Sequence, residues 1–175
     1  MACSQTLAGI ARDCATNMGG IVEVLLANKG DVSAVTVTSG KVTAITMAAS
    51  AHFYKYQFNP ETSSMSSNWQ VNAQNGTKYV QTDLQMIFNR METTKRVEIL
   101  AMAQGDLVAI VKDANGLYWY LGLDEPLQLS AGDGLTGTAR ADRNGYSVTL
   151  QDNSLELPTE ILTGTGGVDI SSLLA

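Results

Sequence analysis

The feature that most constrains this fold is a long stretch of alternating residues from Ser64 to Asn89, interrupted by Asn75-Gly76. On each side of the interruption, apolar and polar side chains alternate, which is typical of β-strands with two different faces. Asn and Gly tolerate best the positive φ angles that a two-residue hairpin turn requires. The sequence therefore predicts one long β-hairpin that turns at Asn75-Gly76.

The predicted turn also fixes which residues lie opposite each other. Apolar residues face apolar residues and polar residues face polar ones along the whole hairpin, so register and face agree. The predicted pairs are Gln74 with Thr77, Val71 with Val80, Gln70 with Gln81, and Met65 with Met86.

The two faces of this hairpin differ in chemistry. One face is apolar and is expected to pack on the body of the protein; it carries Met65, Trp69, Val71, Leu84, Met86 and Phe88. The other face is rich in amide and hydroxyl groups and nearly free of charge, unlike an ordinary solvated face with Lys and Glu. Its residues are Ser66, Asn68, Gln70, Asn72, Gln81, Asp83 and Gln85.

Composition favours a single β-rich domain. The chain has 175 residues, of which 16% are charged, with 16 glycines and three prolines, a balance that suits many short strands and tight turns. We expect an N-terminal arm or segment at 1–19, a β domain at 20–162 and a flexible tail at 163–175.

The remaining pattern predicts further hairpins and one helix. The period changes to that of a helix at 92–104, with Gly105 as its C′ residue. The segment 127–137 is expected to be a loop. The expected strands are 20–28, a hairpin at 34–47 turning at Ser39-Gly40, a strand at 52–58, the pair 107–111 and 117–123, a hairpin at 139–151 turning at Asn144-Gly145, and a short strand at 155–157.

In the predicted hairpins, Val37 lies opposite Val42, Val35 opposite Ala44, Ala141 opposite Val148, and Ala139 opposite Leu150. Together these elements predict a mainly β fold. We expect a β-sandwich or a partly closed antiparallel barrel, with one flanking α-helix and a long projecting β-hairpin.

Catalytic and metal-binding motifs are weak, so we expect a protein that is not an enzyme and has no cofactor or metal. The single histidine, His52, is expected to be packed and hydrogen-bonded on an aromatic strand face. The segment 132–137 fits G-x-G-x-x-G by letter but neither follows a clear strand nor opens a helix. Cys3 and Cys14 lack metal-ligand spacing and are expected to be buried free thiols, with a late disulfide as the alternative.

Charge and hydropathy limit the partners. The net charge of −6 argues against binding to a phosphate backbone, which needs clustered Lys and Arg. The sequence has no signal peptide pattern and no run near the ~18 apolar residues of a membrane span. Synthesis in the cytoplasm, with release only on lysis, is the expectation.

The order of elements resembles that of phage tail-tube proteins and the related ring proteins of tail collars. The segments 113–122 and 144–152 look like parts of structural proteins from phages of Bacteroidetes, including the crAss-like group. The likeness spans most of 20–160. It implies a virion protein of the tail or neck, made in the host cytoplasm, whose hairpins join into a closed ring around a DNA channel.

The resemblance gives the hairpin a mechanism. Its polar face would line the channel, with Asn75 and Gly76 at the turn serving ring assembly. The partners would be six or twelve copies of the chain, neighbouring tail, neck or portal-proximal proteins, and viral DNA that passes without specific binding, with no membrane. Only Asp83 gives this wall a negative charge, less than the family habit of a strongly negative lumen.

A different function remains open at this point. Tyr118, Trp119 and Tyr120 could form an exposed stacking surface for a sugar, as in a carbohydrate- or host-binding β-sandwich of a head decoration or fibre. Packing of these residues between sheets is the other interpretation, and their burial distinguishes the two.

Overall fold

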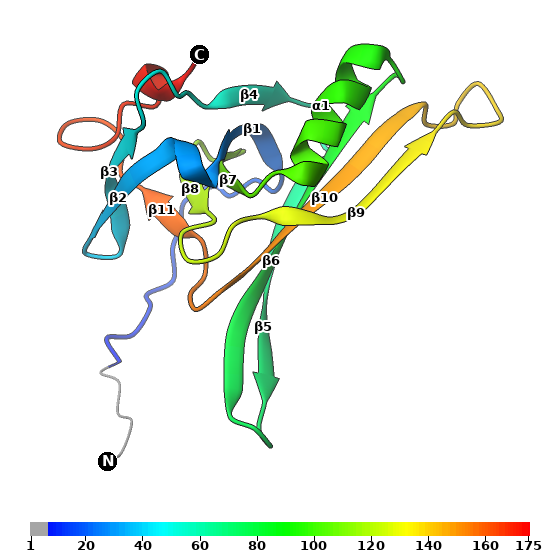
Figure 1. Ribbon diagram of the computed structural model, residues 1–175. Coiled ribbons are helices and arrows are strands. Elements are labelled where there is room, and N and C mark those ends of the chain that lie inside the picture. Colours follow the sequence, from blue (N-terminus) through cyan, green and yellow to red (C-terminus); the bar gives the residue numbers. More distant parts are fainter. Residues whose placement is uncertain (1–6) are drawn as a thin grey trace.

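The computed structural model describes residues 7–175 as two β-sheets, a helix and a projecting hairpin (Figure 1). The larger sheet has seven strands, which pair in the order β2 (Val32–Thr38), β3 (Lys41–Met47), β11 (Thr159–Ile161), β8 (Tyr118–Leu121), β7 (Leu107–Asp113), β1 (Ile21–Asn28) and β4 (Tyr54–Gln57). The smaller sheet has four, in the order β5 (Ser64–Asn72), β6 (Thr77–Asn89), β10 (Gly145–Ser154) and β9 (Gln128–Leu135).

One α-helix, α1 (Thr93–Gln104), follows the hairpin, and two 3-10 turns occupy Lys29–Asp31 and Ile170–Leu173. The mainly β class with a flanking helix is therefore confirmed. Within residues 7–175 neither sheet closes into a barrel, and the two sheets pack in a sandwich-like arrangement. The helix ends at Gln104, and the backbone of the following Gly105 is extended, with φ −96°, rather than left-handed.

The core has two parts because the central strands β1 and β7 are buried on both faces. Side chains on alternate positions of these strands point to opposite faces of the sheet. One set packs between the two sheets and under α1, and includes Val24, Leu26, Leu84, Met86, Met102, Val148 and Leu150. The other set lies on the far face of the larger sheet and includes Leu25, Val42, Phe53, Ile110, Tyr120, Ile161 and Leu173.

The C-terminal residues 163–175, expected as a flexible tail, pack on this second part of the core. Val168 and Leu173 are buried, and the Phe53 N–H donates to the Leu173 carbonyl at 2.8 Å. The predicted short strand at 155–157 is instead a loop with exposed Leu155 and Leu157. The strand that follows it, β11, pairs in parallel with β3.

The long hairpin has the predicted faces but a different register. Asn72 pairs with Thr77, so the loop has four residues, 73–76, and every pair is shifted by two from the prediction. Only Gly76 in this loop has a positive φ, +71°, while the Asn75 side chain accepts from the Thr77 N–H at 3.0 Å. A four-residue loop of this kind replaces the two-residue turn. The faces survive because a shift of two preserves alternation.

The predicted hairpin at 34–47 has the expected turn but only part of the expected pairing. At Ser39-Gly40 both φ angles are positive and Val37 pairs with Val42, as predicted. A bulge before Val37 then pairs Val35 with Ile45, so the predicted pairing with Ala44 is wrong.

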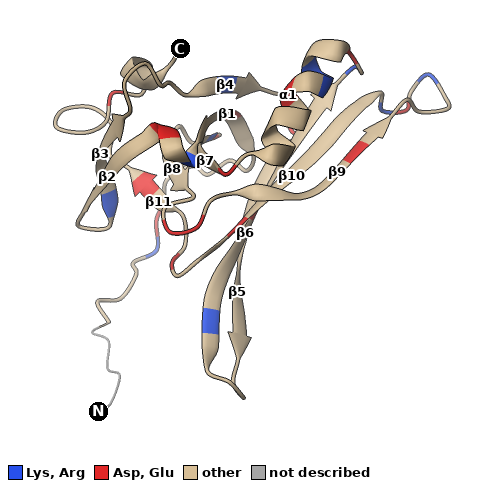
Figure 2. Ribbon diagram, in the orientation of Figure 1, with Lys and Arg blue, Asp and Glu red and all other residues tan. Residues whose placement is uncertain are grey.

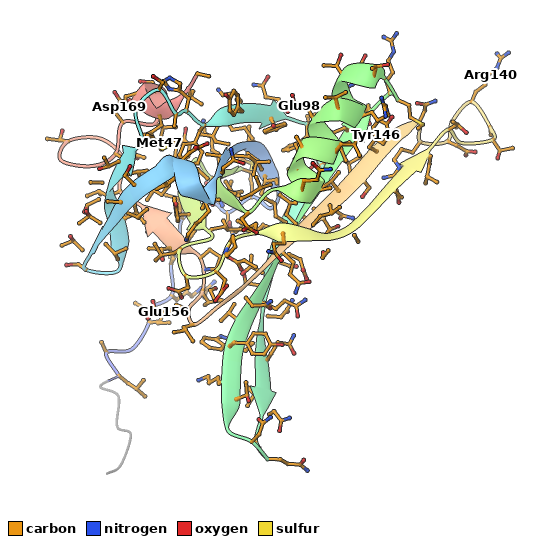
Figure 3. All side chains as sticks on the ribbon, viewed as in Figure 1. Met47, Glu98, Arg140, Tyr146, Glu156 and Asp169 are labelled. Carbon is orange, nitrogen blue, oxygen red and sulfur yellow. The ribbon has the colours of Figure 1, made fainter. Side chains whose placement is uncertain are left out.

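The predicted hairpin at 139–151 is wrong. Strand β10 begins at Gly145 and pairs with β9 and β6, so the segment 127–137 contains a strand rather than a loop. The β9–β10 connection covers 136–144, where Asp142 Oδ2 accepts from the N–H groups of Thr138 and Ala139 at 2.8 and 2.7 Å. Its tip carries Arg140, which points away from the body (Figure 3).

Candidate functional site: the outer face of the four-stranded sheet

The smaller sheet turns one face toward the larger sheet and the other toward solvent; we call these its inner and outer faces. On the inner face Leu84, Met86, Val148 and Leu150 are buried in the core. Residues directly opposite each other on paired strands share a face, so the register extends each face across the sheet. The outer face contains the rows Ser64–Gln85–Thr149, Ser66–Asp83–Gln151 and Asn68–Gln81–Asn153.

The register brings all the polar hairpin residues singled out from the sequence onto this outer face. They do not form a pocket, because they are spread along two adjacent strands. In order along the chain they are Ser66, Asn68, Gln70, Asn72, Gln81, Asp83 and Gln85.

The outer face has little charge. Among the outward positions of these four strands the only charged residues are Asp83 and Asp133, and none is Lys or Arg. Arg143 Nη2 lies 2.5 Å from Asp133 Oδ1 and neutralises that carboxylate, whereas Asp83 accepts from Gln81 Nε2 at 3.4 Å. Figure 2 shows this pattern, with most of the hairpin and sheet in tan.

Strand β10 adds residues to this face that the sequence interpretation did not include. Thr149, Gln151 and Asn153 stand beside Gln85, Asp83 and Gln81 of β6. The alternation of Thr149 and Gln151 with the apolar Val148 and Leu150 was a usable signal. Assigning the segment to a separate hairpin with 139–143 obscured their place beside the long hairpin.

The inner face of the hairpin is covered only at its base. Leu84 and Met86 are fully buried, and Met65 and Phe88 are partly buried, in agreement with the predicted packing. Nearer the tip, Trp69 is 48% exposed and Val71 67% exposed, so packing of these two on the body of the same chain is wrong. Strand β10 ends beside Val80, and the hairpin continues beyond it.

Both edge strands of the small sheet have one unpaired side. Strand β5 pairs only with β6, and β9 pairs only with β10, among residues 7–175. An unpaired edge presents backbone N–H and C=O groups that can pair with another chain. Each copy of the protein therefore offers two such edges, at opposite sides of the outer face.

A buried carboxylate lies where β10 meets the larger sheet. Asp152 is 4% exposed, and its Oδ2 accepts from the Gly122 N–H at 3.0 Å. Lys29 Nζ donates to the carbonyl oxygens of Gly122 and, at 2.6 Å, Leu123. The two side chains thus hold the same segment from either side.

Burial shifts the pKa of Asp152 and of Lys29 in the direction that favours the neutral form of each side chain. Desolvation raises the pKa of Asp152 above its ordinary value, opposed by the Gly122 N–H donor. Desolvation lowers the pKa of Lys29, opposed by the nearby carboxylates of Asp124 and Glu125. Neither Lys29 nor Asp152 was singled out from the sequence, because the fold brings together residues far apart in the chain.

His52 does not occupy the packed site expected of it. Its side chain is exposed, and the next residue, Phe53, fills the core instead. The reason is that β4 covers only Tyr54–Gln57, and a bridge from Phe53 to Leu174 turns the Phe53 ring inward.

The aromatic run at 118–120 is split between the two faces of the larger sheet. Trp119 packs against the core between the sheets and its Nε1 donates to Asp113 Oδ2 at 3.1 Å. Tyr120 is 2% exposed on the opposite side, where Tyr118 also packs. These rings do not form one exposed stacking surface, so the carbohydrate-binding alternative loses the surface on which it depended.

Other candidate sites give little chemistry. In the described part of the chain, no group of three or more His, Cys, Asp and Glu residues is placed to hold a metal ion. Cys14 is a free, exposed thiol rather than a buried one, and Cys3 lies outside the described residues. None of the helices among residues 7–175 has the length and apolar character needed to cross a membrane.

Comparison with protein-family models, with curated proteins and with solved structures found no match to this chain.

Proposed function

We propose that this protein is a virion structural protein that assembles into a closed ring of a phage tail tube or neck and encloses the DNA channel. The observation that carries the proposal is the four-stranded sheet, which combines an outer face almost free of charge with two unpaired edges. The outer face would be the inner wall of the ring.

The strand directions suit ring closure. All neighbours in the order β5, β6, β10, β9 are antiparallel, so the two edge strands β5 and β9 run in opposite directions. The β9 edge of one copy can therefore pair with the β5 edge of the next while keeping an antiparallel pattern. Closure of such a ring would pair both free edges of every four-stranded sheet, which favours a closed assembly over an open chain.

The chemistry of the outer face suits passage of DNA. Lys and Arg bind phosphates and release counterions, so a wall with such residues would retain DNA. The outer face instead presents amides and hydroxyls, together with the carboxylate of Asp83, which accepts from the Gln81 amide. DNA could pass such a wall without specific binding. The acidic net charge of −6 adds weak repulsion.

We propose a ring of six or twelve copies, joined to neighbouring tail, neck or portal-proximal proteins in the virion. Negative-stain microscopy of the purified protein tests this directly, because rings, tubes and monomers differ in outline. Replacement of Asn75 by Pro together with Gly76 by Val should abolish rings. A field of monomers from the wild-type protein would contradict the proposal.

A second experiment tests the wall. Gln70→Lys, Asn72→Lys and Gln81→Lys together add three cations to the outer face, and rings of this variant should retain DNA in a manner that weakens steeply with salt. In virus particles the same change should slow genome ejection. The matched control adds three lysines to exposed positions of β2, at Ser33, Thr36 and Thr38. Equal DNA retention by both variants would contradict the channel-wall assignment.

A further inference from the structure

The N-terminal residues 7–16, which we call the arm, form no helix or strand. Every residue from 7 to 20 is exposed, and the apolar side chains of Leu7 and Ile10 are 92% and 102% exposed. Figure 1 shows the arm leaving the body on the same side as the hairpin. Two aliphatic side chains this exposed gain free energy if another surface covers them.

The body holds the root of the arm firmly. The Met18 N–H donates to Asn115 Oδ1 at 2.8 Å, and Asn115 Nδ2 donates to Asn17 Oδ1 at 2.9 Å and to the Met18 carbonyl at 3.1 Å. The Ala114 N–H also donates to the Gly20 carbonyl at 3.1 Å. The arm therefore starts from a fixed point, and its ten residues can extend roughly 33 Å from there, far enough to reach a neighbouring molecule.

Exposed apolar residues lie on the inner face of the hairpin and on the loop that follows β10. Trp69, Val80 and Ser154 form one row across β5, β6 and β10, so their side chains share the inner face. Leu155 follows Ser154 directly and is 70% exposed, and Leu157 is 50% exposed. We call these exposed apolar residues, Trp69 and Val71 on the hairpin and Leu155 and Leu157 on the loop, the acceptor surface.

We propose that the arm of one copy packs on the acceptor surface of a second copy of this chain. Leu7 and Ile10 then cover apolar side chains that their own molecule leaves exposed. Arg12 of the arm meets the exposed carboxylates of Asp124 and Glu156 beside the acceptor surface, while Asp13 is engaged with its own backbone through the Ala15 N–H at 2.8 Å.

This contact goes beyond the edge pairing proposed for ring closure. It uses the inner face of the hairpin and the arm, whereas ring closure uses the free edges of β5 and β9. In a ring it would tie each copy to a neighbour through a side chain contact, and it can also exist between copies that form no ring. Glu156, labelled in Figure 3, marks the loop that carries Leu155 and Leu157.

Crosslinking from the arm tests the proposal on the full chain. With Cys3 replaced by Ser, Cys14 is the remaining thiol, and a short thiol–amine reagent can join it to Lys78 on the acceptor side of the hairpin. The experiment mixes ¹⁴N and ¹⁵N protein and identifies crosslinked peptides by mass spectrometry. Mixed-isotope Cys14–Lys78 pairs are expected. Pairs of one isotope only, or an absence of this pair, would overturn the proposal.

Matched variants separate packing from chance proximity. Leu7→Ser with Ile10→Ser should lower the yield of the mixed crosslink at least about tenfold, because each side chain loses its apolar burial. Ala8→Ser with Ala11→Ser, in the same arm, should change the yield little. An equal loss in both variants would overturn the inference.

The acceptor side has its own pair of variants. Leu155→Ser with Leu157→Ser should lower the mixed crosslink to the same extent, while Leu135→Ser, an exposed residue at the far end of β9, should not. All four leucine and alanine variants alter exposed residues, and circular dichroism checks that the fold is kept. Rings without the mixed crosslink would overturn this inference alone, and the mixed crosslink without rings would overturn only the proposed ring.

Discussion

Trp69 and Lys78 lie on the same face of the projecting hairpin, with Lys78 Nζ 4.6 Å from the centre of the Trp69 ring. This cation–π contact holds the indole beside its own strand pair and leaves 48% of the residue exposed. Such contacts at exposed sites contribute about 0.5–1 kcal/mol. The inner face of the hairpin is thus buried at the base, where it stabilises the fold, and exposed toward the tip, where it is available to a partner.

The division of the inner face predicts different effects of two substitutions. Leu84→Ala removes a fully buried side chain from the core between the sheets and should lower the free energy of unfolding by about 2–5 kcal/mol. Trp69→Ala should lower it by about 1 kcal/mol or less, because the ring is half exposed and loses mainly the contact with Lys78. Urea denaturation of the dilute protein measures both values.

The order of the two variants should be reversed for self-association, which Trp69→Ala should weaken more than Leu84→Ala. Trp69→Ala alters the acceptor surface and should weaken self-association while keeping the fold. Val22→Ala, which changes another half-exposed apolar residue away from the hairpin, is the control. Equal losses in the free energy of unfolding for Leu84→Ala and Trp69→Ala would show that the inner face near the hairpin tip is packed in the monomer.

Two glycines with positive φ predict contrasting costs. Gly145 has φ +156°, and a Cβ there would collide with the Phe88 carbonyl oxygen, because the backbones of β10 and β6 approach closely. Gly145→Ala should therefore prevent stable pairing of these strands. Gly76→Ala meets no atom within 4 Å and should cost only about 1 kcal/mol for its left-handed φ of +71°. Thermal unfolding followed by circular dichroism distinguishes the two.

The anchoring of the arm predicts a local effect. Asn115→Ala removes both the acceptor of the Met18 N–H and the donor to Asn17 and Met18, so the amide of Met18 should exchange with solvent faster. The overall free energy of unfolding should change little, because the affected residues are exposed. Hydrogen exchange followed by NMR measures the amide, with Asn153→Ala on β10 as the control. Unchanged exchange at Met18 would show that the arm is held by other contacts.

The alternation between Ser64 and Asn89 was sufficient to predict the hairpin and its two faces, since a strand has a period of two. It was not sufficient to predict the register, because Asn75-Gly76 is compatible with more than one loop length. The choice depends on local hydrogen bonds, such as that from the Gln74 N–H to Asn72 Oδ1 at 3.0 Å. A shift of two preserved the faces, so the candidate site residues were predictable even with the wrong pairs.

The partners of the hairpin were not predictable from local pattern. Strand β10 pairs with β6 and β9 over residues that read equally well as a hairpin turning at Asn144-Gly145. Long-range pairing of this kind depends on which surfaces the whole chain can bury together. The buried contact of Asp152 with Gly122 follows from that pairing and could not be expected before it.

Asp152 predicts an unusual dependence of stability on pH. Because burial raises its pKa in the folded state, the folded protein binds a proton that the unfolded chain has already released. The contribution of Asp152 to stability is thus greatest near and below the ordinary pKa of Asp, about 3.9, and decreases as the pH rises through the raised value. Asp152→Asn removes the charge, so its free energy of unfolding relative to wild type should increase from about pH 4 to pH 7.

Asp142 provides a control of opposite sign. The N–H groups of Ala139 and Thr138 donate to its carboxylate and lower its pKa, so its contribution is present above the ordinary value and is lost on acidification. Asp142→Asn should therefore lose stability relative to wild type as the pH rises through the acidic range to the ordinary pKa of Asp, about 3.9, and the difference should then stay constant up to pH 7. Urea denaturation at several pH values gives both differences. A pH-independent difference for Asp152→Asn would show that Asp152 is ionised in the folded protein as readily as in the unfolded chain.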